Sequence, residues 1–252
     1  MADEEVVFQT STGPVRIITA ASLFDGHDAA INVMRRLIQS SGAEVIHLGH
    51  DQSAKAVVDC AIQEDAHGVA LTSYQGGHIE YFTYIRQLLD EAGCEHVRIF
   101  GGGGGTITPP EIKTLHESGI SKIYSPDDGR TLGLMGMIHH LMGIASEVDN
   151  ISKERLSTLD GPVTPEDMAK VGLLLTMSES ADDALFKSTL ETCRSSNDDV
   201  PVIGFTGTGG AGKSSLLDEL MLRILRDNPD KKICLLCVDP TRKRTGGALL
   251  GD

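Results

Sequence analysis

The sequence lacks the features that bind polyanions or membranes. Its 252 residues contain 22 Lys and Arg against 36 Asp and Glu, a formal net charge of -14, with no basic block. Such a charge disfavours nucleic acid and anionic membrane surfaces. No apolar run approaches the roughly 20 residues of a membrane span. The acidic residues 1–5 have no apolar stretch after them, unlike a signal peptide. We therefore expect a cytoplasmic protein with no nucleic-acid and no membrane partner.

Cysteine is also scarce. The five cysteines are odd in number and scattered, unlike a disulfide framework. Cys234 and Cys237 have the spacing of a redox or zinc motif, but they lie in an apolar run, residues 233–238, that is typical of a strand. Side chains three residues apart in a strand point to opposite faces. We therefore expect a buried structural role for both cysteines.

Short apolar runs alternate with amphipathic stretches over residues 1–145. This alternation, with glycines near the expected helix ends, predicts an α/β fold with a doubly wound parallel sheet of the flavodoxin-like type. Residues 125–129 are expected to form a turn beside the carboxyl edge of the sheet. The expected strands are 16–20, 44–47, 68–72, 97–100 and 122–124, and the expected helices are 29–40, 53–64, 78–92, 109–118 and 132–142.

The loop after the first expected strand could position a metal ligand. Residues 22–28 read Ser-Leu-Phe-Asp-Gly-His-Asp, which places Asp25 two residues before His27. A carboxylate there can accept the proton of one imidazole nitrogen, which fixes the tautomer and makes the other nitrogen a better ligand. Taken alone, the pattern equally suits a surface turn whose Asp caps the next helix.

Two further loops favour the ligand interpretation. Residues 73–77 follow the third expected strand, and five consecutive glycines, residues 101–105, follow the fourth. Parallel strands bring their carboxyl ends to one edge of the sheet, where open α/β folds bind ligands. Glycine lets the backbone approach a bulky ligand or adopt positive φ. The run therefore indicates a function rather than a merely flexible loop.

These loops resemble the cobalamin-binding domain of adenosylcobalamin-dependent mutases, whose signature is Asp-x-His-x-x-Gly, then Ser-x-Leu, then Gly-Gly. The resemblance runs from about residue 15 to about residue 143. It implies that His27 is the lower axial ligand of cobalt, in place of the cofactor's own dimethylbenzimidazole, with Asp25 as its hydrogen-bond partner. Ala30 and Gln75 depart from the pattern, which has Gly and Leu there. The implied cofactor-binding residues are Asp25, Gly26, His27, Asp28, Ser73, Gln75, Gly101, Gly102 and Gly103.

A second ligand-binding unit is expected at residues 200–252, after a helical linker at residues 146–199 where strand signals vanish. An apolar run at 202–206, expected as a strand, leads into Gly-x-x-x-x-Gly-Lys-Ser and an amphipathic helix at 215–226. In such a loop the backbone donors cradle phosphate, Lys213 adds a cation and the Ser214 hydroxyl reaches Mg²⁺. The predicted nucleotide site comprises Gly207, Gly209, Gly210, Ala211, Gly212, Lys213, Ser214 and Ser215.

The tail, residues 238–252, is similar to the segment after the second strand of the small GTPase chaperones of cobalamin mutases. This likeness implies GTP as the nucleotide and implies that Asp239 and Asp252 join Ser214 around Mg²⁺, a cation that carboxylates suit. For Asp239 the alternative is a strand-end turn with Pro240. No Asn-Lys-x-Asp element and no later Asp-x-x-Gly follow. We therefore expect a truncated part of a longer protein.

The order of the two units resembles the family of fused isobutyryl-CoA mutases. It implies a radical rearrangement that interconverts isobutyryl-CoA and n-butyryl-CoA with adenosylcobalamin, while the GTPase, with GTP and Mg²⁺, gates cofactor loading or protects the mutase. It also implies a downstream barrel that binds acyl-CoA, and a homodimer. Without the barrel this chain is expected to bind cobalamin but not to convert acyl-CoA, and it holds no catalytic residue.

Two other functions are compatible with the residues. The chain could be a cobalamin-responsive regulator or cofactor carrier in which the nucleotide switch controls a partner; an output domain downstream, instead of a barrel, would favour this. It could also be a P-loop ATPase beside an unrelated flavodoxin-like domain, which predicts no cobalamin binding.

Overall fold

The computed structural model describes residues 8–11, 13–164, 166–180, 182–194 and 200–237. The chain divides into two compact units, residues 1–196 and residues 197–252. Each unit is described by itself.

The first unit is built on a five-stranded parallel sheet with strand order β4-β3-β5-β6-β7. Strand β3, the first of this sheet in the sequence, therefore lies between β4 and β5, which is the order of flavodoxin-like folds. Such folds bind ligands at the switch point, here between β3 and β5. The predicted doubly wound α/β fold is confirmed. The strands are β3 (Arg16–Ser22), β4 (Glu44–Gln52), β5 (Gly68–Thr72), β6 (Arg98–Gly102) and β7 (Lys122–Tyr124).

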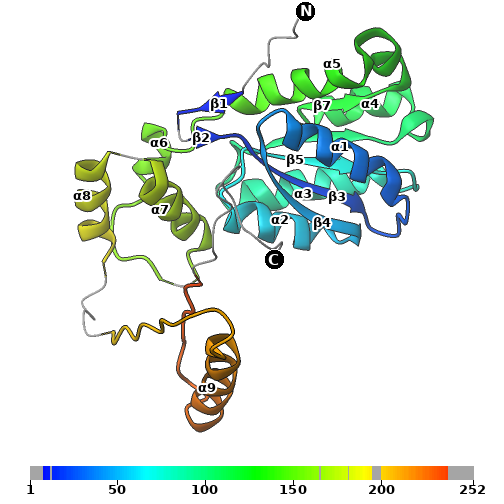
Figure 1. Ribbon diagram of the computed structural model, residues 1–252. Helices are drawn as coiled ribbons and strands as arrows, with labels where there is room; N and C mark the ends of the chain where they lie inside the picture. The colour runs from blue at the N-terminus through cyan, green and yellow to red at the C-terminus, as the bar shows by residue number, and fades with distance from the viewer. Residues whose placement is uncertain (1–7, 12, 165, 181, 195–199, 238–252) are drawn as a thin grey trace, which may run out of the picture. The chain divides into compact units, whose positions relative to one another are not determined.

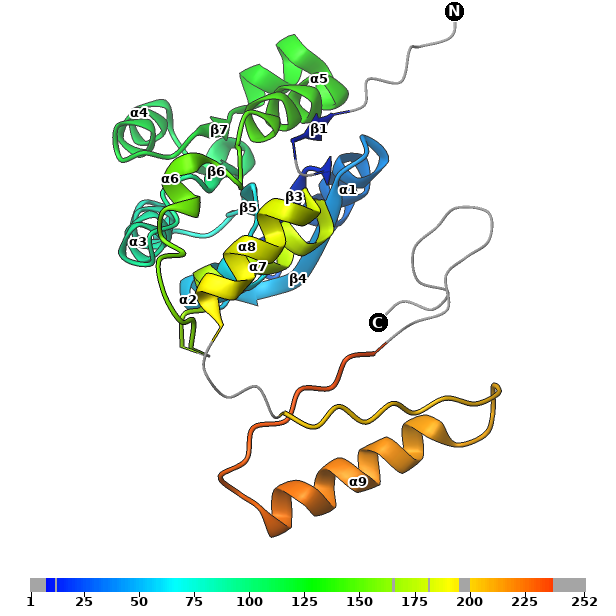
Figure 2. The same cartoon turned by 90° about the vertical axis from the view of Figure 1, so that its left-hand side faces the viewer.

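Helices cover both faces of this sheet (Figures 1 and 2). Helices α1 (Asp28–Ser40) and α5 (Pro126–Ser146) pack on one face. Helices α2 (Ala54–Gln63), α3 (His78–Glu91) and α4 (Pro109–Glu117) pack on the other. Successive side chains of a strand point to opposite faces, so Ile17 joins the core under α1 and α5 while Ile18 joins the core under α2 and α3.

Residues 125–129 form the start of α5 and not the expected turn. Ser125 Oγ accepts the N–H of Asp128, and Asp128 Oδ2 accepts the N–H of Ser125, with Pro126 in the first helical turn. This reciprocal pair is a capping box, and Pro suits the first helical position. The turn prediction was wrong because the Ser-Pro-Asp-Asp signals serve a helix start as well as a turn. The helix then kinks at Gly133, whose φ is 67°.

Smaller elements complete the first unit. A short antiparallel pair, β1 (Gln9–Thr10) and β2 (Gly13–Pro14), precedes the sheet, and a 3-10 turn, η1 (Gly104–Thr106), follows β6. Strand β4 extends five residues beyond the expected end at residue 47, to Gln52. None of the helices in the described ranges is long and apolar enough to cross a membrane.

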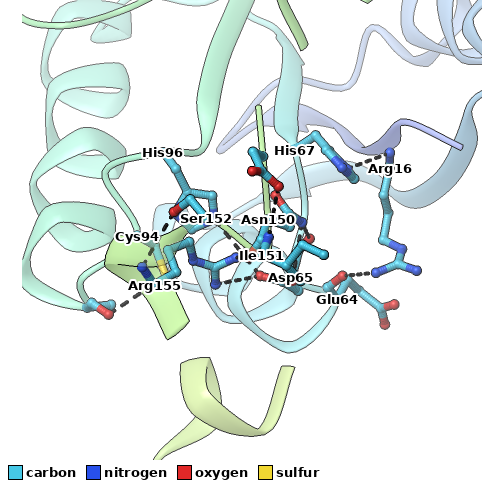
Figure 3. Close-up of polar contacts among 12 residues, drawn as sticks. Arg16, Glu64, Asp65, His67, Cys94, His96, Asn150, Ile151, Ser152 and Arg155 are labelled. Carbon is cyan, nitrogen blue, oxygen red and sulfur yellow. Dashed lines mark hydrogen bonds and ion pairs between the residues drawn. The ribbon is translucent and has the colours of Figure 1, made fainter. Parts of the chain in front are cut away.

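Three helices of the first unit follow α5 in the described residues: α6 (Lys153–Leu156), α7 (Met168–Ser180) and α8 (Asp183–Cys193). A buried polar network holds the start of this segment against the loop between α2 and β5 (Figure 3). Arg155 Nη2 donates to Asp65 Oδ1 at 2.7 Å, and Asn150 Nδ2 donates to the backbone O of Asp65 at 2.6 Å. Asp65 and Asn150 are at most 3% exposed. Truncation of one partner of such an ion pair leaves an uncompensated buried charge.

Two histidines border this network, and both are held in the neutral form. Burial lowers the pKa of His67 to about 4. Its Nδ1 accepts the backbone N–H of Arg16 at 3.0 Å, so a proton on that nitrogen would break the bond. Burial likewise lowers the pKa of His96 to about 4, and the nearby Arg155 guanidinium adds to the effect.

The second unit contains helix α9 (Lys213–Asp227), but residues 202–206 and 233–237 do not form the expected strands. Both runs are exposed, with Val202 94% and Leu236 87% accessible. Cys234 and Cys237 are exposed free thiols, so the expected buried role is wrong. A parallel strand needs neighbours to satisfy its backbone and layers to cover its faces. Within the described part of this unit neither run has such a neighbour.

Candidate functional site

Asp25 and His27 meet at the carboxyl end of β3. His27 Nδ1 lies 2.7 Å from Asp25 Oδ1; the Asp25 side chain is fully buried, whereas that of His27 is 64% exposed. Asp25 also accepts the backbone N–H groups of His27, at 2.9 Å, and Tyr74, at 2.6 Å. A carboxylate in this position fixes Nδ1 as the protonated nitrogen, so Nε2 carries the lone pair that can bind a metal.

The hydrogen bonds keep Asp25 ionised. Burial by itself raises the pKa of this carboxyl group, but the N–H donors of Tyr74 and His27 outweigh it and hold the pKa below its ordinary value. Asp25 therefore joins the loop after β3 to the loop after β5 as well as orienting the imidazole. The predicted contact between the Asp25 carboxylate and the His27 imidazole is therefore formed within one short loop.

The three predicted loops lie together and interlock. Ser22 Oγ donates to Ser73 Oγ at 3.0 Å, and the N–H of Ser73 donates to the backbone O of Gly102 at 2.9 Å. A Cβ on Gly103 would lie 1.9 Å from the backbone O of Ser73, and one on Gly101 would lie 2.4 Å from the ring of Phe82. Real Cβ atoms do not approach so closely, so these two glycines are required by close packing.

An apolar cavity of about 460 Å³ opens beside these loops. It lies among α1, α5 and the carboxyl ends of β5, β6 and β7, and its walls include Met34, Tyr74, Phe100 and Met137. Thr72 also lines it, and the buried Thr72 Oγ1 has no hydrogen-bond partner among the described residues. A buried hydroxyl without a partner is costly and suggests that a ligand supplies one.

Thr72 and Tyr74 are the site residues that the sequence did not single out. The available signal for Thr72 was a hydroxyl that ends an otherwise apolar strand, Gly-Val-Ala-Leu-Thr. For Tyr74 only the fold reveals the role, because its ring lies 5.4 Å from the His27 ring, centroid to centroid, while its N–H reaches Asp25. Ser73, which was predicted, uses its hydroxyl to hold Ser22.

The remaining predicted residues of this edge are placed as follows. Gly26 and Gln75 are exposed, Asp28 is the first residue of α1, and Gly102 is half-buried. Ala30, which departs from the family pattern, lines the cavity with its small side chain. No group of three or more His, Cys, Asp or Glu side chains that could hold a metal ion occurs in the described ranges.

The phosphate-binding loop precedes α9 in the second unit. Gly207, Gly210 and Gly212 have φ of 159°, 77° and 81°, and the last of them caps the helix. Lys213 Nζ donates to the backbone O atoms of Gly207 and Thr208, each at 2.9 Å. Gly209, Ala211, Ser214 and Ser215 are exposed. Asp239 and Asp252 lie outside the described residues, so their assignment to Mg²⁺ stays a prediction.

Two family models match the chain. Residues 15–123 match the B12 binding domain, and residues 171–252 match the methylmalonyl-CoA mutase-associated GTPase MeaB. The first match contains the Asp25 loop and the cavity walls from β5 and β6. The second contains the phosphate-binding loop.

Curated relatives extend the match to nearly the whole chain. The chain is 51% identical to the fused isobutyryl-CoA mutase of Geobacillus kaustophilus over 94% of its own length, and 51% identical to that of Nocardia farcinica over 95%. It spans 22% of the length of each of these relatives.

A shorter relative matches the first unit. The 2-hydroxyisobutanoyl-CoA mutase small subunit of Aquincola tertiaricarbonis is 33% identical, and the match covers 45% of this chain and 82% of that protein. The resemblance predicted from the three loops and the phosphate-binding loop is confirmed. The chain therefore belongs to the B12-binding family of acyl-CoA mutases and aligns with fused isobutyryl-CoA mutases, with a B12-binding domain ahead of the beginning of a MeaB-type GTPase domain.

Proposed function

We propose that His27 is the axial ligand of cobalt when cobalamin binds this chain. The observation that carries the proposal is the geometry of the His27 ring, which is exposed on the sheet edge while its Nδ1 is bound to the fully buried Asp25 carboxylate. A single histidine suits a metal whose other ligands come with its own macrocycle.

The cavity beside the loops after β5 and β6 is suited to the nucleotide tail of the cofactor. Its volume, about 460 Å³, lies in the range of roughly 300–1,000 Å³ that is usual for small-molecule sites. Apolar walls favour an aromatic base, and Thr72, whose buried Oγ1 has no partner among the described residues, is a polar member of the lining that could bond the base. Gly101 and Gly103 let the loops approach each other closely enough to form the wall.

Replacement of Thr72 by Val tests the cavity assignment. Val keeps the shape but removes the hydroxyl, so cobalamin affinity should fall about tenfold, the usual worth of one hydrogen bond to a buried group. Stability without ligand should not fall, because the hydroxyl has no partner there. Thr72→Ser, which keeps the hydroxyl, is the control. Titration calorimetry measures the affinities. Equal affinity of the Val variant and the unchanged protein would contradict the assignment of the nucleotide tail to a site that uses the Thr72 hydroxyl.

In the second unit, GTP with Mg²⁺ would bind the loop at residues 207–214. The positive-φ glycines bring the loop to the amino end of α9, where unpaired backbone N–H groups suit a phosphate. Lys213, now bonded to two loop carbonyls, is the cation that phosphate oxygens would attract. The Ser214 hydroxyl, exposed at the start of α9, would reach the metal.

For the longer protein we infer an adenosylcobalamin-dependent mutase that interconverts isobutyryl-CoA and n-butyryl-CoA. Support comes from the 51% identity to relatives of that name. Bound adenosylcobalamin supplies the radical chemistry, whereas the residues of this chain bind and orient the cofactor. The acyl-CoA would bind a downstream barrel, the GTPase would gate cofactor loading or protect the mutase, and the full protein would be a homodimer.

The ultraviolet-visible spectrum during a cobalamin titration tests the axial ligand. The unchanged chain should bind with saturation and show the spectrum of imidazole-ligated cobalt, and His27→Ala should lose that spectrum. His50→Ala is the matched control, because His50 is an exposed histidine near the carboxyl end of β4. Identical spectra for all three proteins would exclude His27 as the ligand, and no binding by any of them would exclude the cobalamin site.

A further inference from the structure

The loop that carries His27 holds an aromatic residue in an unfavourable backbone conformation. Phe24 has φ of 64°, and Asp51, on the neighbouring strand end, has φ of 56°. A left-handed backbone is tolerated by Asp but is uncommon for a bulky side chain. Among the described residues one other non-glycine position, Asp65, has positive φ. Phe24 and Asp51 thus lie on or against the loop that carries the proposed cobalt ligand.

Phe24 and Asp51 are hydrogen-bonded to each other. Asp51 Oδ1 accepts the N–H of Phe24 at 2.7 Å, and the N–H of Asp51 donates to the backbone O of Asp25 at 3.2 Å. These two bonds run in opposite directions and close a ring between the two strand ends, which we call the Asp51 clasp. The clasp binds both residues that flank the peptide bond between Phe24 and Asp25.

An irregularity in the sheet brings Asp51 to this place. Strand β3 pairs with β4 in regular register up to Thr19, which lies opposite His47. The register then shifts twice, before and after Ala20, so that Ala20 lies opposite Gly49 and Ser22 lies opposite Gln52. Such shifts often lie next to functional sites, where they change the direction of a side chain. Here the shift places the Asp51 carboxylate beside the loop after β3.

Packing does not explain the conformation of Phe24. Its side chain is 79% exposed, so the ring contributes little to the core. Strained residues persist where the surroundings impose them, and they gather at functional sites. Two features impose it: the clasp, and a tight turn in which the N–H of Asp25 donates to the backbone O of Ser22 at 3.0 Å. The exposed ring lies on the same short loop as the exposed His27 imidazole.

We propose that Asp51 is a positioning residue, which holds residues 24 and 25 so that Phe24 presents its ring to the bound corrin while Asp25 orients His27. This inference rests on the proposed role of His27. The corrin is a broad ring with methyl groups among its amide side chains, and an exposed aromatic side chain beside its axial ligand would cover part of it. The clasp would order this contact surface before the cofactor arrives.

Phe24→Gly separates strain from contact. Glycine accepts positive φ and has no ring, so the midpoint of thermal unfolding without ligand should rise by about 2–4 °C. Cobalamin affinity should nevertheless fall about tenfold, a loss of about 1.4 kcal/mol of binding free energy. A higher midpoint with unchanged affinity would overturn the contact with the corrin, and it would leave a contact with another domain as the reason for the exposed ring.

Asp51→Gly and Asp51→Asn form a matched pair for the clasp. Glycine keeps the left-handed backbone but removes the acceptor, whereas asparagine keeps both. We expect Asp51→Gly to lower cobalamin affinity about tenfold and to lower the fraction of imidazole-ligated cobalt at saturation. Asp51→Asn should match the unchanged chain. Equal ligation in all three proteins would overturn the positioning role.

The His27→Ala titration distinguishes failure of this inference from failure of the proposed function. If His27→Ala loses the imidazole spectrum while Asp51→Gly keeps it, the clasp is not a positioning device. If His27→Ala itself changes nothing, the axial assignment on which the inference depends is wrong. If His27→Ala and Asp51→Gly both lose the imidazole spectrum while Asp51→Asn keeps it, the result supports both the axial role of His27 and the positioning role of Asp51.

Discussion

Acidification from pH 6.5 to about pH 4 is expected to destabilise the first unit by several kcal/mol through two buried histidines. Burial lowers the pKa of His67 and of His96 from 6.5 to about 4 in the folded state. Between these two values the unfolded chain binds more protons than the folded chain, so stability falls as the pH falls. Over that window each histidine should cost up to about 3 kcal/mol. Above pH 6.5 both histidines are neutral in the folded and in the unfolded chain, so they do not make the free energy of unfolding depend on pH.

The structure explains why protonation cannot be accommodated. His67 Nδ1 accepts the N–H of Arg16, so a proton on Nδ1 removes the acceptor and leaves a buried donor. A charged His96 would be buried and would be repelled by the Arg155 guanidinium. The attraction of Asp65, whose Oδ1 lies 3.9 Å from His96 Nε2, does not outweigh these two effects on the pKa. Urea denaturation at neutral pH and at about pH 4.5 measures the loss.

A double variant that cannot titrate provides the control. In His67→Asn the amide oxygen can still accept the N–H of Arg16, and His96→Gln keeps a polar side chain beside Asp65. The double variant should lose most of the pH dependence between about 6.5 and 4. If its denaturation midpoint falls with acid as steeply as that of the unchanged chain, other groups carry the effect.

Gly103→Ala is expected to disrupt the site and to destabilise the domain. The added Cβ would lie 1.9 Å from the backbone O of Ser73, and this carbonyl is not the flexible end of a side chain that can turn away. The loops after β5 and β6 must therefore separate. Overpacking of this kind costs about 1–3 kcal/mol and occasionally more. The cavity wall moves with the loops, so cobalamin affinity should fall at least about tenfold.

Gly105→Ala is the matched control from the same run. Nothing lies within 4 Å of a Cβ at Gly105, and its φ is not positive. This variant should keep both the thermal midpoint and the cobalamin affinity of the unchanged chain. If the two alanine variants behaved alike, the run would act through backbone flexibility and not through the close contact at Gly103.

The glycine run shows how far local sequence can be read. Its composition indicated a function, but five identical residues carry no information on which of them is needed. The fold separates them, because Gly101 and Gly103 meet Phe82 and Ser73, whereas Gly105 faces open space. Those neighbours come from α3 and from the loop after β5, so no local pattern could identify them.

The buried network around Asp65 was not predicted for a related reason. Arg155 and Asp65 are 90 positions apart, and each is an ordinary charged residue in its own segment. Only the packing of the segment after α5 against the loop between α2 and β5 turns them into a buried ion pair. The same packing removes His67 and His96 from water and so lowers their pKa values.

The sequence by itself determined the doubly wound fold, the loop with Asp25 and His27, and the phosphate-binding loop, because each depends on hydrophobic period or on residue types a few positions apart. Tertiary structure decided the rest. The partnerless Thr72 hydroxyl, the Asp51 clasp and the exposed runs of the second unit depend on which distant segments become neighbours. Burial, steric contact and strand pairing arise only between such neighbours, so they cannot be read one segment at a time.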